Sequence, residues 1–69
     1  MFEHYPDIMN VKQVAEALAV GKNTVYRLIT QNELPSFTIG NSIKIPKQGL
    51  LTYIQHACYN ADYIAHSLL

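Results

Sequence analysis

This chain of 69 residues has no pair of cysteines, no long apolar run and no basic N-terminal segment. Cys58 is the single cysteine, which excludes an internal disulfide framework and fits a reducing cytosol. No apolar run approaches the roughly 20 residues that a membrane-spanning helix requires. Residues 1–9 contain two acidic residues and no Lys or Arg, so a signal peptide is not expected. These absences favour a cytoplasmic protein with no membrane partner.

Residue groupings typical of catalysis or metal binding are also missing. The histidines and the cysteine lack the close pairing of zinc ligands, and His56 and Cys58 would lie about 200° apart around a helix. That geometry also excludes a Cys–His nucleophilic pair. No glycine-rich phosphate loop occurs, and the chain is small for both a pocket and a catalytic constellation. We therefore expect no metal, no cofactor and no enzymatic activity.

Charge is scarce, because five basic and five acidic residues give a net charge of zero. A neutral chain argues against nucleic acid as a partner, since neutralisation of phosphates supplies much of the affinity of DNA-binding domains. The basic residues are clustered, however, between positions 10 and 47, where Glu16 and Glu33 alone oppose them: Lys12, Lys22, Arg27, Lys44 and Lys47. This distribution predicts a basic face on a neutral body.

Apolar residues make up 49% of the chain, as in globular proteins. A chain of this length has room for one domain with a small core, since it buries only about 60% of its unfolded surface. Pro6 disfavours helix at Tyr5. Residues 1–9 are therefore interpreted as a lead-in and residues 10–69 as a single domain.

The first helix is predicted to begin after Asn10 and to end near Leu18. Asn10 is a strong N-cap residue, and Gln13 completes a capping box with it. Met9 and Val14 are placed to form a hydrophobic staple.

A second helix is predicted from Lys22 to about Gln31, after a turn at 19–21 with Gly21 as its N-cap. Its spacing to the first helix is that of a helix-turn-helix, whose small and apolar positions are Val14, Ala15, Leu18, Val20, Val25 and Leu28. Leu18 and Val20 are expected to fill the corner between the helices. The face of the second helix away from the core is expected to be open to solvent, with Lys22 at its edge: Asn23, Tyr26, Arg27 and Thr30.

Two short runs of alternating residues, 37–39 and 42–45, flank Gly40-Asn41 and predict a hairpin with a tight primed turn. A hairpin that directly follows a helix-turn-helix is a wing. We expect Phe37, Ile43 and Ile45 to belong to the core.

A third helix is predicted over residues 47–69. Its apolar positions follow a heptad-like seam: Leu50, Ile54, Ala57, Ala61, Ile64 and Leu68. The first half of this seam should cover the core. The second half either covers the domain itself or contacts a second copy or another protein, since exposed apolar patches tend to mark interaction sites.

The segment from Met9 to Ile54 resembles the excisionase-type, MerR-like winged helix-turn-helix DNA-binding family. The matching pieces are VKQVAEALAV, KNTVYRLI and ELPSFTIGNSIKIPKQGLLTYI. The resemblance implies a mainly helical fold with a small β-hairpin. It also implies that the recognition helix meets the major groove through Lys22, Asn23, Thr24, Tyr26 and Arg27. The wing, which in the family touches the minor groove or nearby phosphates, is matched by Gly40, Asn41, Ser42 and Lys44.

The chemistry of the individual side chains leaves several roles open. Arg27 suits either a bidentate contact to guanine or a phosphate contact, and Asn23 suits adenine. Tyr26 either donates its hydroxyl to phosphate or packs on the corner of the fold. Lys44 and Lys47 are better suited to phosphates than to base edges.

The family resemblance implies a protein that binds and bends double-stranded DNA beside an attachment site and assists an integrase in excision. Such a protein would act in the bacterial cytoplasm, in association with the nucleoid. A transcriptional regulator of a mobile element is the alternative within the same class. An interaction module that works through the C-terminal helix is the alternative from another class, and the neutral net charge favours it.

Overall fold

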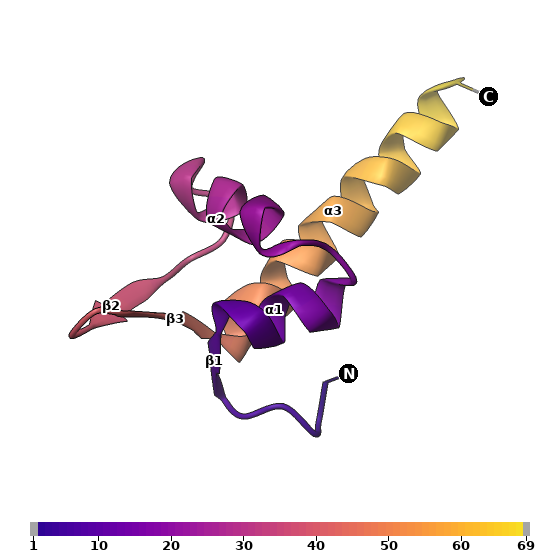
Figure 1. Ribbon diagram of the computed structural model, residues 1–69. Coiled ribbons are helices and arrows are strands. Elements are labelled where there is room, and N and C mark those ends of the chain that lie inside the picture. Colours follow the sequence, from indigo (N-terminus) through magenta and orange to yellow (C-terminus); the bar gives the residue numbers. More distant parts are fainter. Residues whose placement is uncertain (1, 69) are drawn as a thin grey trace.

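The computed structural model describes the backbone of residues 2–68 and the side chains of residues 2–58. Three helices and a three-stranded antiparallel sheet make up the fold, which is mainly helical as predicted (Figure 1). The elements are, in chain order, β1 (Ile8–Asn10), α1 (Val11–Leu18), α2 (Lys22–Thr30), β2 (Phe37–Ile39), β3 (Ser42–Pro46) and α3 (Lys47–Leu68).

The start of α1 has the predicted capping box. The backbone N–H of Gln13 donates to Asn10 Oδ1 at 2.7 Å, and the backbone N–H of Asn10 donates to Gln13 Oε1 at 3.0 Å. These bonds satisfy amide groups that have no partner within the helix. The helix ends at Leu18, because Ala19 adopts a left-handed conformation with φ of 57°.

The turn between α1 and α2 places Gly21 at the predicted N-cap of α2. Ala15, Val25 and Leu28 are buried where the two helices meet, which confirms the corner. The expectation for Val20 was wrong, because this side chain is 39% exposed. Ala19, in its left-handed conformation, ends the helix directly before Val20. The backbone N–H of Val20 then donates to the Ala15 carbonyl, and the Val20 side chain faces outward.

The sheet has the strand order β1-β3-β2, with β1 as a strand that the sequence analysis did not predict. In β1, Met9 pairs with Ile45 and Asn10 pairs with Lys44. A strand of three residues is too short to show an alternating pattern, so only its partner β3 reveals it. Through this pairing the buried Met9 side chain becomes part of the core.

The wing is formed by β2 and β3, with Ile39 opposite Ser42 and a two-residue turn at Gly40 and Asn41. Gly40 has φ of 60°, as a primed turn requires at its first position. Ile45 is buried and Ile43 is half-buried, as expected for core residues. The expectation for Phe37 was wrong: it is 41% exposed, because its pairing with Lys44 puts it on the outer face of the sheet.

The first two turns of α3 close the core. Leu50 is buried and Ile54 is half-buried, whereas Ala57 and Cys58 are exposed. The side chains of Ala61, Ile64 and Leu68 lie outside the part that the structure describes. Figure 1 shows α3 leaving the body of the domain as a single straight helix, in line with the elongated dimensions of 48 × 26 × 18 Å.

Candidate nucleic-acid interface

The outward face of α2 is open to solvent, as predicted. Asn23, Tyr26, Arg27 and Thr30 are all exposed. Val25 and Leu28 hold the opposite face in the core, so the amphipathic pattern of the helix sets the direction of these side chains. The Thr30 hydroxyl donates to the Tyr26 carbonyl at 2.9 Å, so its proton is already used within the helix.

A polar hollow of about 350 Å³ lies where the start of α1, the start of α2 and the wing come together. Three of the lining side chains are lysines and none is acidic. The lining residues are Asn10, Val11, Lys12, Lys22, Tyr26, Asn41, Ser42, Ile43 and Lys44.

The electrostatics of the hollow favour an anion. Within the part of the chain that the structure describes, Lys12, Lys22 and Lys44 have no carboxylate within 4.0 Å. Both α1 and α2 begin at the hollow, and neither carries an acidic residue in its first turn. Helix N-termini bear a partial positive charge. No side chain caps the start of α2, so its first amide N–H groups remain available as donors.

The structure brings together five of the residues singled out in the sequence. Lys22, Tyr26, Asn41, Ser42 and Lys44 all line the hollow. Asn23, Arg27 and Thr30 extend the same surface along α2, Thr24 is half-buried beside them, and Gly40 stands at the tip of the wing.

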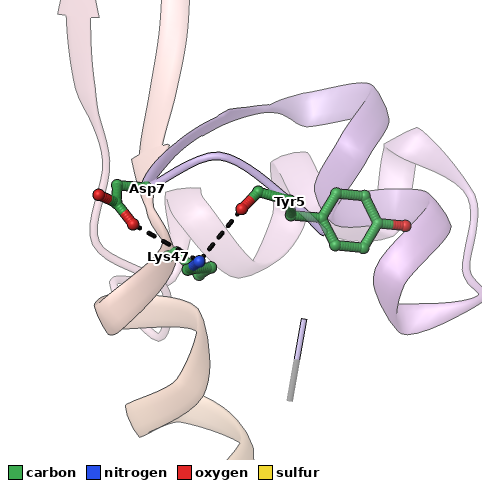
Figure 2. A network of polar contacts seen from close by, with 3 residues as sticks. All are labelled: Tyr5, Asp7 and Lys47. Atoms are coloured by element: carbon green, nitrogen blue, oxygen red, sulfur yellow. Dashed lines mark hydrogen bonds and ion pairs between the residues drawn. The ribbon is translucent and has the colours of Figure 1, made fainter. Parts of the chain in front are cut away.

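Lys47 lies outside the hollow, beside the N-terminal segment. Its ammonium donates to the Tyr5 carbonyl at 3.1 Å and lies 3.5 Å from Asp7 Oδ1 (Figure 2). The backbone N–H of Lys47 donates to the Asp7 carbonyl at 2.7 Å. This lysine therefore ties the N-terminal segment to the start of α3, and its half-buried side chain does not reach the hollow.

Sequence reasoning missed Asn10, Val11 and Lys12 as parts of this surface. The unpredicted pairing of Asn10 with Lys44 is what brings the first turn of α1 beside the wing. The one sequence signal for Lys12 was its place in the basic segment, and that signal does not say which face of the fold it occupies.

Neither a metal-binding cluster nor a membrane-spanning helix is found among the residues that the structure describes. No three His, Cys, Asp or Glu side chains lie close enough together to hold a metal ion. No described helix is both long and apolar enough to cross a membrane.

A helix pair followed by a two-stranded hairpin and a further helix is the architecture of winged helix-turn-helix proteins. The chain belongs to the helix-turn-helix domain family, whose model matches residues 8–57 and so includes β1.

Similar proteins occur in two strains of Mycobacterium tuberculosis, CDC 1551 and H37Rv, under the names "Putative DNA-binding protein MT0521" and "Putative DNA-binding protein Rv0500A". Each is 30% identical to this chain over 54 residues, a stretch that covers 78% of this chain and 69% of the relative. No solved structure matches the chain.

Proposed function

We propose that this protein binds double-stranded DNA, with α2 in the major groove and the lysines of the hollow on the phosphate backbone. The observation that carries the proposal is the hollow itself, where the starts of two helices converge with three lysines that have no carboxylate partner among the described residues. The names of the mycobacterial relatives agree with this proposal.

Within this interface, we assign base contacts to Arg27 and Asn23. Both are exposed on α2, and their side chains have the geometry to contact guanine and adenine edges. Lys12, Lys22 and Lys44 serve as phosphate contacts, which position the protein on the duplex without reading its sequence. Lys47 is left out of this set, since its ammonium is held by the N-terminal segment.

The test of this proposal begins with a bound duplex selected from random sequences, on which the affinity of Arg27→Ala is compared with that of the parent. A base contact of Arg27 predicts a loss of about 1–3 kcal/mol. Gln55→Ala is the matched control, because Gln55 is exposed on α3, away from the hollow. Equal binding by the parent and Arg27→Ala would refute the assignment to α2.

Salt dependence separates the phosphate contacts from the base contacts. Each of Lys12→Ala, Lys22→Ala and Lys44→Ala should reduce the slope of log K against log salt by about 0.9. An interaction module without a DNA-binding role would instead show no duplex binding that depends on salt in this way.

For the biological role, we propose an architectural excision factor that bends DNA and assists an integrase, which performs the chemistry. The projecting α3 supports a partner contact, because its exposed residues Ala57 and Cys58 are not needed to cover the core. A second copy could also use the seam of this helix: Ile54, Ala57, Ala61, Ile64 and Leu68.

Excision reactions with and without the protein test this role. An excision factor shifts the product ratio of the integrase toward excision, whereas a transcriptional regulator changes expression from a promoter and leaves that ratio unchanged. A gene position beside an integrase gene would favour the first role.

A further inference from the structure

A groove of about 430 Å³ lies between the loop after α2 and the first turns of α3. Glu33 and Pro35 form the wall on the loop side. The other wall consists of five positions that share one face of α3: Gln48, Gly49, Thr52, Tyr53 and His56. We call this feature the α3 groove. None of these described residues also lines the cationic hollow, so the proposed DNA contact leaves the groove unused.

The loop wall is held in place by the end of α2. Asn32 adopts a left-handed conformation with φ of 60°. The backbone N–H groups of Glu33 and Leu34 both donate to the Leu28 carbonyl, at 2.9 Å and 3.3 Å, and such bonds commonly close a helix. The Leu34 side chain is buried in the core. The backbone of Glu33 is therefore fixed before any ligand arrives.

The α3 wall is equally well defined. The Pro35 ring packs against Gly49, at a place where a Cβ atom would collide with it. Tyr53 is half-buried and packs against the core, which fixes its place at the groove. The Thr52 hydroxyl donates to the Gln48 carbonyl at 3.0 Å, so its proton is used within the helix. The groove is thus preformed and mainly apolar, as sites for small molecules are.

The charge at the α3 groove favours a cation. Glu33 lines the groove, whereas no described Lys or Arg does. Among the described residues, the Glu33 carboxylate has no Lys, Arg or His nitrogen within 4.0 Å. The face of an aromatic ring such as that of Tyr53 also attracts cations. A phosphate would be repelled here, so the groove does not extend the proposed DNA surface.

The surroundings of the groove favour a small molecule over a protein partner. Protein interfaces have a core of large apolar and aromatic side chains. None of the exposed large apolar side chains in the described part of the chain lines this groove. Its volume lies within the range of about 300–1,000 Å³ that is typical of sites for small molecules.

We propose that the α3 groove binds a small organic cation with a flat apolar body, such as an amidine, a guanidine or an aromatic amine. The Glu33 carboxylate accepts hydrogen bonds from the cationic group, and a planar amidinium or guanidinium matches both of its oxygens. The rings of Tyr53 and Pro35 contact the apolar body. Gln48 and His56 supply further hydrogen-bonding groups. This site goes beyond the proposed DNA binding and does not depend on it.

The probe is benzamidine, which carries a planar amidinium group on a phenyl ring. Benzamide is the matched control ligand, because it has nearly the same shape without the charge. Amide NMR spectra of the full chain during titration with each compound locate and quantify binding. Benzamidine should shift the amide signals of Glu33, Gly49 and Tyr53. It should bind about tenfold more tightly than benzamide, as expected for a charge-assisted pair.

Glu33→Gln tests the charge directly, because it removes the carboxylate and keeps the size of the side chain. This variant should bind benzamidine about tenfold more weakly than the parent and benzamide equally well. Glu16→Gln is the matched control, since Glu16 is exposed on α1 and does not line the groove. It should bind benzamidine like the parent.

Two variants of Tyr53 test the aromatic wall. Tyr53→Phe keeps the ring and should retain benzamidine binding. Tyr53→Leu removes the ring and should weaken binding about fivefold. Thermal unfolding checks that both are folded, and Glu33→Gln still decides the question if the leucine variant is not.

Several results would overturn the inference. Benzamidine might shift no signals of the groove residues, benzamide might bind equally tightly, or Glu33→Gln might bind benzamidine like the parent. Displacement of benzamidine by a bound duplex would also overturn it, since DNA would then cover the groove. A parent that binds benzamidine as expected but binds no duplex would contradict the proposed function and would support the cation site.

Discussion

The body of the domain and the part of α3 after Ile54 differ in how far their described side chains are buried. In the body, Met9, Val14, Val25, Ile45 and Leu50 are fully buried in one cluster that connects β1, α1, α2, β3 and α3. Along α3, burial falls from Leu50 through the half-buried Ile54 to the exposed Ala57 and Cys58. Among the side chains that the structure describes, α3 therefore contributes to the core through its first two turns. The following predictions test this division, from the largest expected effect to the smallest.

The largest effect is expected for Ile45→Ala, which removes a buried side chain from the sheet. The expected loss in the free energy of unfolding is about 2–5 kcal/mol, because a cavity remains where the side chain packed. Chemical denaturation followed by circular dichroism measures it. Ile39→Ala is the matched control on the same hairpin, and an equal loss in both variants would contradict the burial pattern.

Gly49→Ala tests the contact between α3 and the loop after α2. Helix propensity alone predicts that alanine would stabilise this position by about 1 kcal/mol. A Cβ atom at Gly49 would collide with Cγ of the Pro35 ring, however, and would lie 3.2 Å from its Cδ. We therefore expect a loss of about 1–3 kcal/mol from overpacking.

The urea midpoint of Gly49→Ala, compared with that of Gln48→Ala, decides between these two outcomes. Gln48 occupies the neighbouring position of the same helix turn and is exposed. A higher midpoint for Gly49→Ala would mean that Pro35 moves aside easily.

Asn10→Ala removes the capping box of α1, with an expected loss of about 1 kcal/mol in the free energy of unfolding. Asn10→Asp keeps an acceptor for the Gln13 amide and should retain most of that stability. A fall in the thermal midpoint for alanine, but not for aspartate, would confirm that the cap and not the sheet pairing is responsible.

The smallest effect is expected for Asp7→Asn, which breaks the ion pair with Lys47. The Asp7 side chain is 97% exposed, and pairs of this kind contribute about 0–1 kcal/mol because water screens them. The backbone bond from Lys47 to the Asp7 carbonyl remains in this variant. A thermal midpoint that falls as far as that of Asn10→Ala would show that the segment before β1 contributes more than its exposure indicates.

Local sequence patterns predicted most of the helical structure. Asn10 and Gln13 form the expected capping box, Gly21 is the N-cap of α2, and a two-residue turn at Gly40 and Asn41 joins the strands of the wing. Each of these features depends on residues a few positions apart, whose preferences act within one turn of the backbone.

The site was predicted only in part, because its residues come from three separate segments. The exposure of Arg27 followed from the amphipathic pattern of one helix. The inclusion of Lys12 and the separate role of Lys47 depended on β1 and on the N-terminal segment, whose contacts span more than 30 positions. That Lys12, Lys22, Lys44 and the other site residues contact DNA stays a prediction.

The sequence by itself determined the helices, their caps, the turn of the wing and the outward face of α2, since these depend on local backbone preferences and on helical periodicity. Only the tertiary structure decided that β1 joins the sheet, that Phe37 and Ile39 lie outside the core, and that three distant lysines meet in one hollow. The physical reason is that the pairing of strands distant in sequence fixes the register of the sheet. One paired position then decides which face every neighbouring side chain occupies.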